Sequence, residues 1–342
     1  MKWAIPYLTV LIAGTFACSK PPQTTTPAFY YWKSRFELSE YERNYLTRLP
    51  AQKLYIRFFD VDWDFDQKRP VPKGMVTFAD TLPPGLECIP VVFITNRTLT
   101  QIGGEQLPDL AQKISRKLRD LAPPGFRFRE IQLDCDWSQS TQTVYFDLIQ
   151  LIRSNFAPEN PILTATIRLH QVKYFEKTGV PPVQRGMLMY YNMSDIQDPA
   201  VENSILDNKV GQTYLFNFDR YPLPLDLALP VFHWGVLFRD GHMIRILNNL
   251  TAAELADTSR FQKTGDHRFE VQKSTYLNGH YLYRGDELRL EAATPEQVIQ
   301  SARLVRPLLH SPQITLALYH LDSLNISNFP VEKTRAVFEK LF

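Results

Sequence analysis

Four aspartates recur at every second position from Asp60 to Asp66, a spacing that could support chemistry. Alternate side chains of an extended strand share a face, so these carboxylates would stand about 6.5–7 Å apart and repel one another. The repulsion requires a bound cation, a guanidinium such as that of Arg57 or Arg168, or protonation of one acid. Three interpretations stay open: substrate-site carboxylates that include Asp60 and Asp62, a solvated strand end, or a metal site. The glycine-containing spacing of calcium loops is absent, so we assign no metal ligand.

A second acidic pair ends the run from Glu130 to Ser138, in which Gln132, Asp134 and Asp136 share a face. Each carboxylate would cost several kcal/mol if it were buried without a partner. Acids at the end of an apolar strand therefore need either a function or a counter-charge. The structural alternative is that Asp136 caps the following helix or pairs with a nearby arginine.

Aromatic and polar side chains also gather near the ends of the expected strands, which favours a carbohydrate as ligand. The face of an aromatic ring matches the apolar C–H face of a pyranose, and neighbouring polar groups satisfy its hydroxyls. The chain has no serine nucleophile elbow, zinc-binding helix, phosphate loop or CxxC pair, and we predict no cofactor. The candidate substrate-binding residues are Trp32, Arg57, Arg168, His170, Tyr190, Tyr191, Asn192, His233 and Trp234.

These residues must be positioned by strands and helices that alternate along the chain. The pattern predicts an α/β fold, a (β/α)8 TIM barrel, whose functional side chains cluster at the C-terminal ends of the strands. A doubly wound open sheet is the alternative, but the G-x-G-x-x-G turn that would support it is absent. Strands are expected near Phe29–Trp32, Lys53–Asp62, Ile89–Thr95, Ile131–Trp137, Ile162–His170, Gly186–Asn192, Ala228–Phe238 and Ile314–Leu321. Helices are expected over Ser39–Arg48, Leu107–Leu121, Ser140–Ser154 and Pro295–Leu309.

Two segments exceed what a minimal barrel needs. Residues 239–290 are too long for a simple loop, and Asn278-Gly279 is a hairpin signal. We expect an insertion there, after the seventh strand, that covers part of the site. Gln67–Glu87 is expected to be a proline-containing loop after the second strand. The predicted barrel domain is therefore residues 28–342, with residues 239–290 inserted into it.

Two short motifs resemble those of a known family. Asp134-Cys135-Asp136-Trp137 is similar to part of the Asp-x-x-Asp-x-Asp-x-Glu signature on the fourth strand of family 18 glycoside hydrolases, the chitinase-like barrels. Met189-Tyr190-Tyr191-Asn192 resembles that family's sixth-strand Met-x-Tyr-Asp motif. The catalytic motif is altered, because Ser138 replaces the family's glutamate, Asn192 its sixth-strand aspartate and Ile131 the first aspartate of the signature. The chain also resembles uncharacterised bacterial lipoproteins that carry an Asp-x-Asp strand in a glycosidase-type barrel.

The resemblance implies one of two functions. The first is a glycoside hydrolase-like protein that acts on a polysaccharide by carboxylate acid/base chemistry. In it Asp136 would be the acid, its pKa raised against Trp137, while Asp134 would orient it and Asp60 or Asp62 would supply the second carboxylate. The alternative is a non-catalytic glycan-binding barrel that has lost its acid. A serine at position 138 favours this alternative, since a hydroxyl cannot protonate a glycosidic oxygen as a carboxylic acid does.

The N-terminal residues predict that the protein is located in the bacterial cell envelope. Residues 1–17 have the charged start and apolar run of a signal peptide, and Cys18 follows small residues as in a loose lipobox. We expect Cys18 to be lipidated and residues 18–27 to form a flexible tether, so that the protein is membrane-anchored and faces the periplasm or the surface. The two remaining cysteines, Cys88 and Cys135, are expected to be buried thiols, with a disulfide between them as the minor alternative.

The charge balance excludes one class of partner. Lys and Arg total 38 against 36 Asp and Glu, which gives a net charge of +2. No overall basic field results, so nucleic acid is not expected to bind. The expected partners are a carbohydrate and, through the N-terminal lipid, a membrane.

Overall fold

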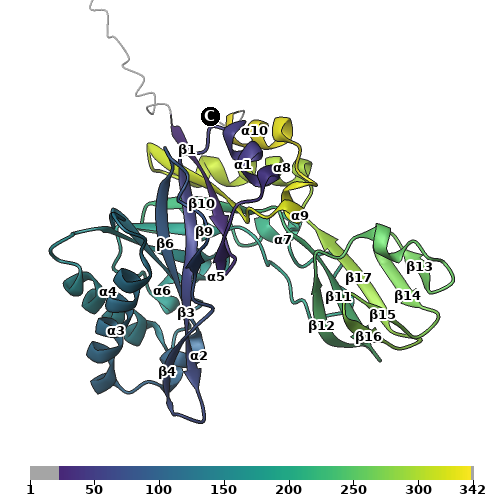
Figure 1. Ribbon diagram of the computed structural model, residues 1–342, viewed down its shortest axis with the longest axis horizontal. Coiled ribbons are helices and arrows are strands. Elements are labelled where there is room, and N and C mark those ends of the chain that lie inside the picture. The colour runs from purple at the N-terminus through teal and green to yellow at the C-terminus, as the bar shows by residue number, and fades with distance from the viewer. Residues whose placement is uncertain (1–22, 340–342) are drawn as a thin grey trace, which may run out of the picture.

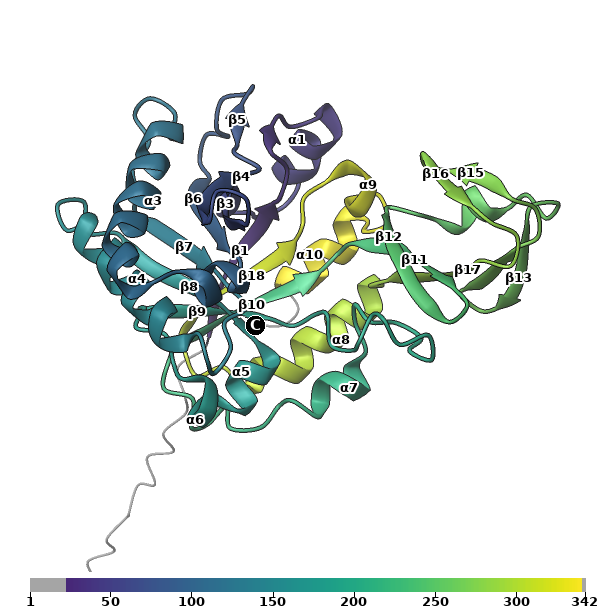
Figure 2. The same ribbon diagram turned by 90° about the horizontal axis from the view of Figure 1, so that it is seen from below.

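The computed structural model describes residues 23–339, and its centre is a closed barrel of eight parallel strands (Figures 1 and 2). The first strand pairs with both the second and the eighth, which closes the ring. This confirms the predicted (β/α)8 fold. The barrel strands are β1 (Thr24–Tyr31), β3 (Lys53–Asp64), β6 (Glu87–Ile94), β7 (Glu130–Asp134), β8 (Ile162–Arg168), β9 (Arg185–Met189), β10 (Leu225–Pro230) and β18 (Gln313–Tyr319).

The helices around the barrel follow the sequence signals closely. Ser39 caps α1 (Glu40–Thr47) in a capping box with Glu42, as the serine before that helix predicts. The expected helix Leu107–Leu121 is found with those bounds as α3, and its leucines and isoleucine face the core. The remaining helices are α2 (Asn96–Gln101), α4 (Gln142–Asn155), α5 (Leu169–Lys173), α6 (Phe175–Thr178), α7 (Asn208–Gln212), α8 (Pro295–Val305), α9 (Ser323–Ile326) and α10 (Val331–Glu339).

The chain between β10 and β18 forms a second, antiparallel sheet with an apolar core of its own. Its strands, in sheet order, are β12 (His242–Asn248), β11 (His233–Arg239), β17 (Glu287–Ala292), β14 (Arg268–Val271) and β13 (Phe261–Gly265). The hairpin of β15 (Thr275–Leu277) and β16 (His280–Leu282) turns at Asn278 and Gly279, both at positive φ, as the Asn-Gly signal predicts.

The expected single strand Ala228–Phe238 is wrong. The chain leaves the barrel after Pro230 and re-enters extended structure at His233, now in the second sheet. Pro230 is the last residue of β10, and because proline has no N–H it donates no further ladder bond there. The continuous apolar run 228–238 therefore contributes strands to two different sheets.

The expected loop after the second strand also contains strands. Within it β4 (Arg69–Lys73) pairs antiparallel with β3, which extends β3 beyond the barrel as a hairpin. The short β5 (Thr77–Phe78) pairs with β2 (Arg35–Phe36). The first barrel strand, β1, begins at Thr24 and so includes part of the segment 18–27 that was expected to be a flexible tether.

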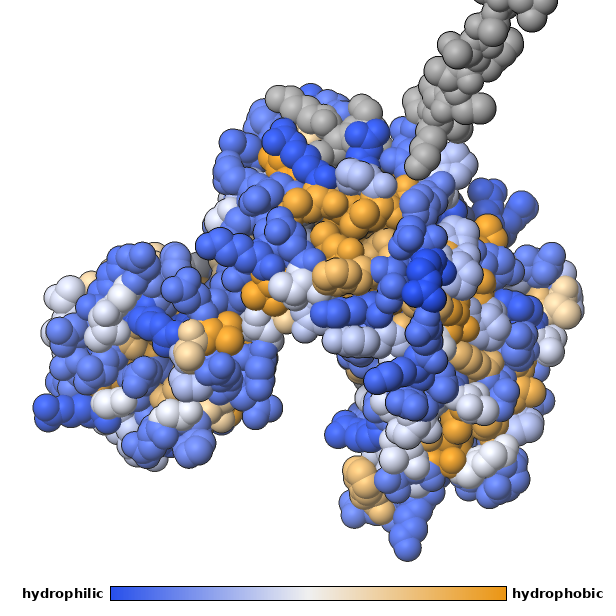
Figure 3. Space-filling model, turned by 180° about the vertical axis from the view of Figure 1, so that it is seen from behind, coloured by the Kyte–Doolittle hydropathy of each residue, from blue (hydrophilic) through white to orange (hydrophobic). Residues whose placement is uncertain are grey.

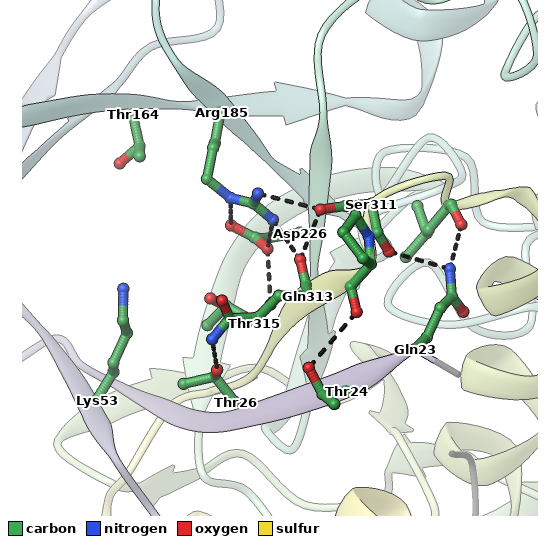
Figure 4. Close-up of polar contacts among 12 residues, drawn as sticks. Gln23, Thr24, Thr26, Lys53, Thr164, Arg185, Asp226, Ser311, Gln313 and Thr315 are labelled. Carbon is green, nitrogen blue, oxygen red and sulfur yellow. Dashed lines mark hydrogen bonds and ion pairs between the residues drawn. The ribbon is translucent and has the colours of Figure 1, made fainter. Parts of the chain in front are cut away.

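Polar groups fill the barrel at its N-terminal end (Figure 4). Arg185 of β9 forms an ion pair with Asp226 of β10, with 3.0 Å between Nε and Oδ2, and the backbone N–H of Thr315 donates to the same carboxylate. Lys53 of β3 donates to Glu130 of β7 at 2.7 Å. This end is therefore closed by charged pairs.

The C-terminal ends of the barrel strands open into a hollow. On one side lies the β3–β4 hairpin with nearby helices, and on the other the second sheet, as Figures 1 and 3 show. Among residues 23–339 no helix has the length and hydropathy to cross a membrane. Cys88 and Cys135 are free thiols, as expected, with Cys135 buried and Cys88 half-buried.

Candidate functional site

An ion pair joins two neighbouring strands at the mouth of the barrel. Arg168, the last residue of β8, donates from Nε and Nη2 to the two carboxylate oxygens of Asp136, and Nη2 lies 3.2 Å from Oδ2. The same guanidinium lies 5.9 Å from the centre of the Tyr191 ring, which follows β9. Asp136 is half-exposed, with 49% of its side-chain surface accessible. Of the two structural roles considered for Asp136, capping a helix and pairing with an arginine, the second is the one found.

Asp134, the last residue of β7, lies deeper than Asp136. It is buried and accepts a hydrogen bond of 2.6 Å from the hydroxyl of Thr166 on β8. Burial, helped by the charges of Asp136 and Asp60, raises the pKa of Asp134 to about 6, against the lowering effects of Arg168 and of the Thr166 hydrogen bond. Asp134 therefore titrates close to neutrality, unlike an ordinary aspartate.

The expected role of Trp137 is wrong. We expected this ring to raise the pKa of Asp136, but Trp137 is buried in the core, where it stacks on Tyr145 of α4 with 5.2 Å between ring centres. Its indole N–H donates to the carbonyl of Thr178. Ser138, which stands at the position of the family's glutamate, shares hydrogen bonds with the hydroxyls of Ser140 and Thr141.

A cavity of about 330 Å³ opens beside the ion pair. Five of its lining residues were predicted and two more adjoin predicted ones, whereas Tyr214, which follows α7, was not predicted. Tyr214 lies in a loop without hydrophobic periodicity, so no signal in the sequence distinguishes it. The cavity is lined by Asp136, Arg168, Leu169, His170, Tyr191, Asn192, Met193 and Tyr214.

A second polar pair lies at the end of β3, next to the first strand. Arg57 donates from Nε to Oδ1 of Asp60 at 2.7 Å, and its guanidinium lies 5.8 Å from the centre of the Trp32 ring. The pair forms because Phe58 is an extra residue in the ladder between β3 and β6, which brings Arg57 and Asp60 to the same side.

Tyr319, at the end of β18, connects the two polar pairs. Its ring centre lies 5.5 Å from that of Trp32 and 5.4 Å from that of Tyr191. Tyr319 was not among the predicted site residues, although it is a strand-end aromatic of the eighth strand like those predicted on the other strands. Trp32, Arg57, Asp60, Asp134, Asp136, Arg168 and Tyr191 thus belong to one mouth.

Asp62 lies apart from this group. Its carboxylate accepts hydrogen bonds from Lys73 of β4, from Arg97 of α2 and from the hydroxyl of Thr95. The hydrogen bonds from Arg97 hold its pKa well below the usual range, although burial opposes them. Both carboxylate oxygens of Asp62 therefore already accept hydrogen bonds from the protein. Because one donor is Lys73 of β4, Asp62 stabilises the β3–β4 hairpin. The four aspartates are not one shared face of free carboxylates, and within residues 23–339 no cluster of His, Cys, Asp and Glu could hold a metal ion.

Tyr190 also lies outside the mouth. Its hydroxyl is buried against Gly211 of α7 and has no hydrogen-bond partner in the described part of the chain. Tyr190 and Tyr191 point to opposite sides, as consecutive residues of extended chain do. Of the two candidates, Tyr191 is the one at the cavity.

His233 and Trp234 are placed by the second sheet rather than by a barrel strand. The Trp234 indole donates to Glu291 at 2.9 Å, and its ring packs on Phe232 at 5.0 Å. Phe232 in turn lies 5.8 Å from Tyr191, so Trp234 adjoins the mouth through Phe232. His233 is buried and lines a different cavity of about 390 Å³, beside Glu291. Cys18, the expected lipidation site, lies outside the described residues.

Solved structures with this fold include enzymes that act on glycans. The spore cortex-lytic enzyme SleL of Bacillus megaterium matches 92% of this chain over 75% of its own, with a TM-score of 0.53 at 10% identity. A chitinase from Chromobacterium violaceum matches 90% of the chain over 98% of its own (TM-score 0.52, 13% identity). A mutant plant class V chitinase from Cycas revoluta, in complex with (GlcNAc)3, matches 92% over 99% (TM-score 0.53, 12% identity). No family model and no curated protein matches the sequence. The fold is that of a glycoside hydrolase-like, chitinase-like barrel.

Proposed function

We propose that the protein binds a glycan at the mouth of its barrel and does not hydrolyse it. The support is the cavity beside the ion pair, whose volume of about 330 Å³ is at the lower end of the range typical of ligand sites. Tyr214, which is half-buried, offers a ring face for the apolar side of a sugar, and the buried Tyr191 forms part of the cavity wall. Arg168, Asp136 and Asn192 offer donors and acceptors for its hydroxyls.

The observation that favours binding over hydrolysis is the ion pair of Arg168 with Asp136. Hydrolysis needs a carboxylic acid that can deliver a proton to the glycosidic oxygen. Both oxygens of Asp136 are directed at the guanidinium, and the serine at position 138 cannot act as that acid. The pair instead presents a fixed set of polar atoms at the cavity, which suits recognition.

A chitooligosaccharide is the first ligand to test, since related folds have been solved with (GlcNAc)3 and (GlcNAc)4. Calorimetric titration with a panel of such oligosaccharides and peptidoglycan fragments measures the affinity. We expect Tyr191→Ala and Tyr214→Ala each to weaken binding by about tenfold, the usual effect of removing a central aromatic contact. Tyr276→Ala is the matched control, because Tyr276 is 70% exposed on the β15–β16 hairpin and lines no part of this cavity. Equal affinities for all three variants would contradict the proposal.

Hydrolysis remains the second candidate because of Asp134. A carboxyl group with a pKa of about 6 holds its proton in weakly acidic solution, as a general acid must. Release of reducing ends from the same panel would favour this candidate. Asp134→Asn should then lower the rate by about 10²–10⁴-fold. Absence of product, together with measurable affinity, favours binding.

The proposed location is the bacterial cell envelope, with Cys18 as the lipidated residue. A glycan of the envelope would then be within reach of the mouth. This location rests on the sequence signal of residues 1–18.

A further inference from the structure

One cavity lies at the N-terminal end of the barrel, opposite the proposed glycan site. Its volume is about 610 Å³, and the residues around it include Thr26, Lys53, Glu87, Arg127 and Arg129. The ion pair of Arg185 with Asp226 (Figure 4) and that of Lys53 with Glu130 close the barrel interior at this end, so a ligand would rest against the outer surface.

Two arginines at this cavity have no counter-charge. Arg127 and Arg129 are exposed and two residues apart, while the intervening Phe128 packs inward against Phe156. Across residues 23–339 neither guanidinium has an ion-pair or hydrogen-bond partner. Glu87 does not neutralise them, because Lys53 lies 3.9 Å from it and 2.7 Å from Glu130. Two neighbouring, unpaired cations repel each other, and an anion with several oxygens relieves that repulsion.

A second cavity, of about 470 Å³, adjoins the basic one and is mostly apolar. The two cavities share the wall formed by Leu82, Gly85 and Leu86. The second is otherwise lined mainly by leucines and prolines, among them Leu38, Leu46, Leu49, Pro83 and Pro84. A basic cavity next to an apolar one suits an amphiphile better than a small free anion.

The described chain begins on this same face, and the inference rests here on the proposed lipidation of Cys18, which would place a membrane near it. The Gln23 side chain donates to the carbonyls of Leu309 and Ser311, just before β18, so the chain enters the structure at the N-terminal end of the barrel (Figure 4). Five residue steps separate Gln23 from Cys18 and can span at most about 17 Å. A lipid on Cys18 would hold this face close to the headgroups.

We infer that the N-terminal face of the barrel docks on an anionic phospholipid surface through Arg127 and Arg129. The phosphate of a headgroup takes the place of the missing counter-charge, and the apolar cavity beside it receives the upper part of an acyl chain. The mouth of the barrel then points away from the bilayer. This docking does not depend on the proposed glycan site, which lies at the other end of the barrel.

Vesicle flotation tests the inference. The chain from residue 18 onward, with Cys18→Ser, keeps every described residue and cannot be acylated. It is mixed with vesicles of phosphatidylcholine alone or with 30% phosphatidylglycerol. We expect binding to the anionic vesicles only, weakened by salt. An arginine near such a surface contributes about fivefold to the binding constant, so Arg127→Gln/Arg129→Gln should bind about twentyfold more weakly.

The matched control is Lys263→Gln/Arg284→Gln, which removes two exposed charges, one from β13 and one from the turn before β17, and should leave binding unchanged. Thermal melts verify that both double variants fold, as expected for exposed side chains. Equal binding to the two kinds of vesicle, or equal losses in the two double variants, would overturn the inference. Arginine-dependent binding of inorganic phosphate without vesicle binding would also overturn it and assign the cavity to a soluble phosphate.

Discussion

The guanidinium of Arg168 binds the carboxylate of Asp136 across the gap between β8 and the chain that follows β7. The same positive charge acts on Asp134, two residues earlier, and lowers its pKa, but burial outweighs this effect. Asp134 and Asp136 are therefore not an interchangeable pair. One is a half-exposed partner of a cation, and the other is a buried group that titrates at about pH 6.

Asp134→Asn should remove a pH dependence of stability. Because the folded-state pKa of about 6 exceeds the unfolded value of about 3.9, the folded protein binds this proton more tightly. The resulting stabilisation is complete below about pH 4 and is lost as the pH rises through about 6. Asp134→Asn has no titratable proton at this position. Between pH 4 and 7 we therefore expect its free energy of unfolding to fall by about 2 kcal/mol less than that of the parent. Urea denaturation across this range measures the difference. An unchanged pH profile would show that Asp134 is not the group responsible.

Arg185→Met should destabilise the barrel at neutral pH far more than at acid pH. Burial raises the pKa of Asp226, while Arg185 opposes that rise. Without the arginine, a buried carboxylate is left unpaired, at a cost of about 3–5 kcal/mol. Below the pKa of Asp226 the carboxyl takes up a proton, so the cost falls as the pH is lowered. Lys333→Met is the control, since its partner Glu296 and its own side chain are both exposed. Chemical denaturation at pH 4 and pH 7 compares the two variants.

Gly211→Ala should be destabilising, and Tyr190→Phe should partly rescue it. A Cβ on Gly211 would collide with the hydroxyl of Tyr190 and press on the sulfur of Met193. Overpacking of this kind costs about 1–3 kcal/mol. Tyr190→Phe alone should be close to neutral, because the buried hydroxyl has no partner among the described residues. A double-mutant cycle from thermal melts measures the coupling, and strict additivity would contradict the predicted contact.

Cys18→Ala should release the protein from the membrane fraction or leave its precursor uncleaved. The prediction follows from the apolar run and the small residues that precede Cys18. Fractionation of expressing cells, with immunodetection of each fraction, distinguishes the outcomes. Normal processing with an unchanged membrane fraction would remove the lipoprotein interpretation. Cys88→Ala serves as the control.

The barrel could be predicted because each strand and each helix carries its own local signal. Leu107–Leu121 keeps helical periodicity throughout, and its predicted bounds are those found. The division of Ala228–Phe238 was missed because both halves are apolar and extended, and sequence alone does not tell which sheet a strand joins. Hydrophobic periodicity reflects only the residues nearby in the sequence. The sheet that a strand joins depends on partner strands that are distant in the sequence.

The mouth could be predicted as a region but not as a set of contacts. The rule that functional groups lie at strand ends correctly placed Asp134, Arg168 and Tyr191 at the mouth. Alternation alone set Arg57 and Asp60 on opposite faces, and only the bulge at Phe58 brings them together. Such a bulge is a property of two strands in register, which no single run of residues reveals.

The pairing of β1 with β18 has a consequence for how the protein is made. Thr24 and Gln313 are neighbours in the finished ring, although 289 positions separate them. A chain emerging from the ribosome therefore carries two open strand edges, on β1 and on β10, until nearly all of it has been synthesised. Unpaired edges readily join those of other chains, so truncation before β18 should yield aggregates rather than a smaller barrel.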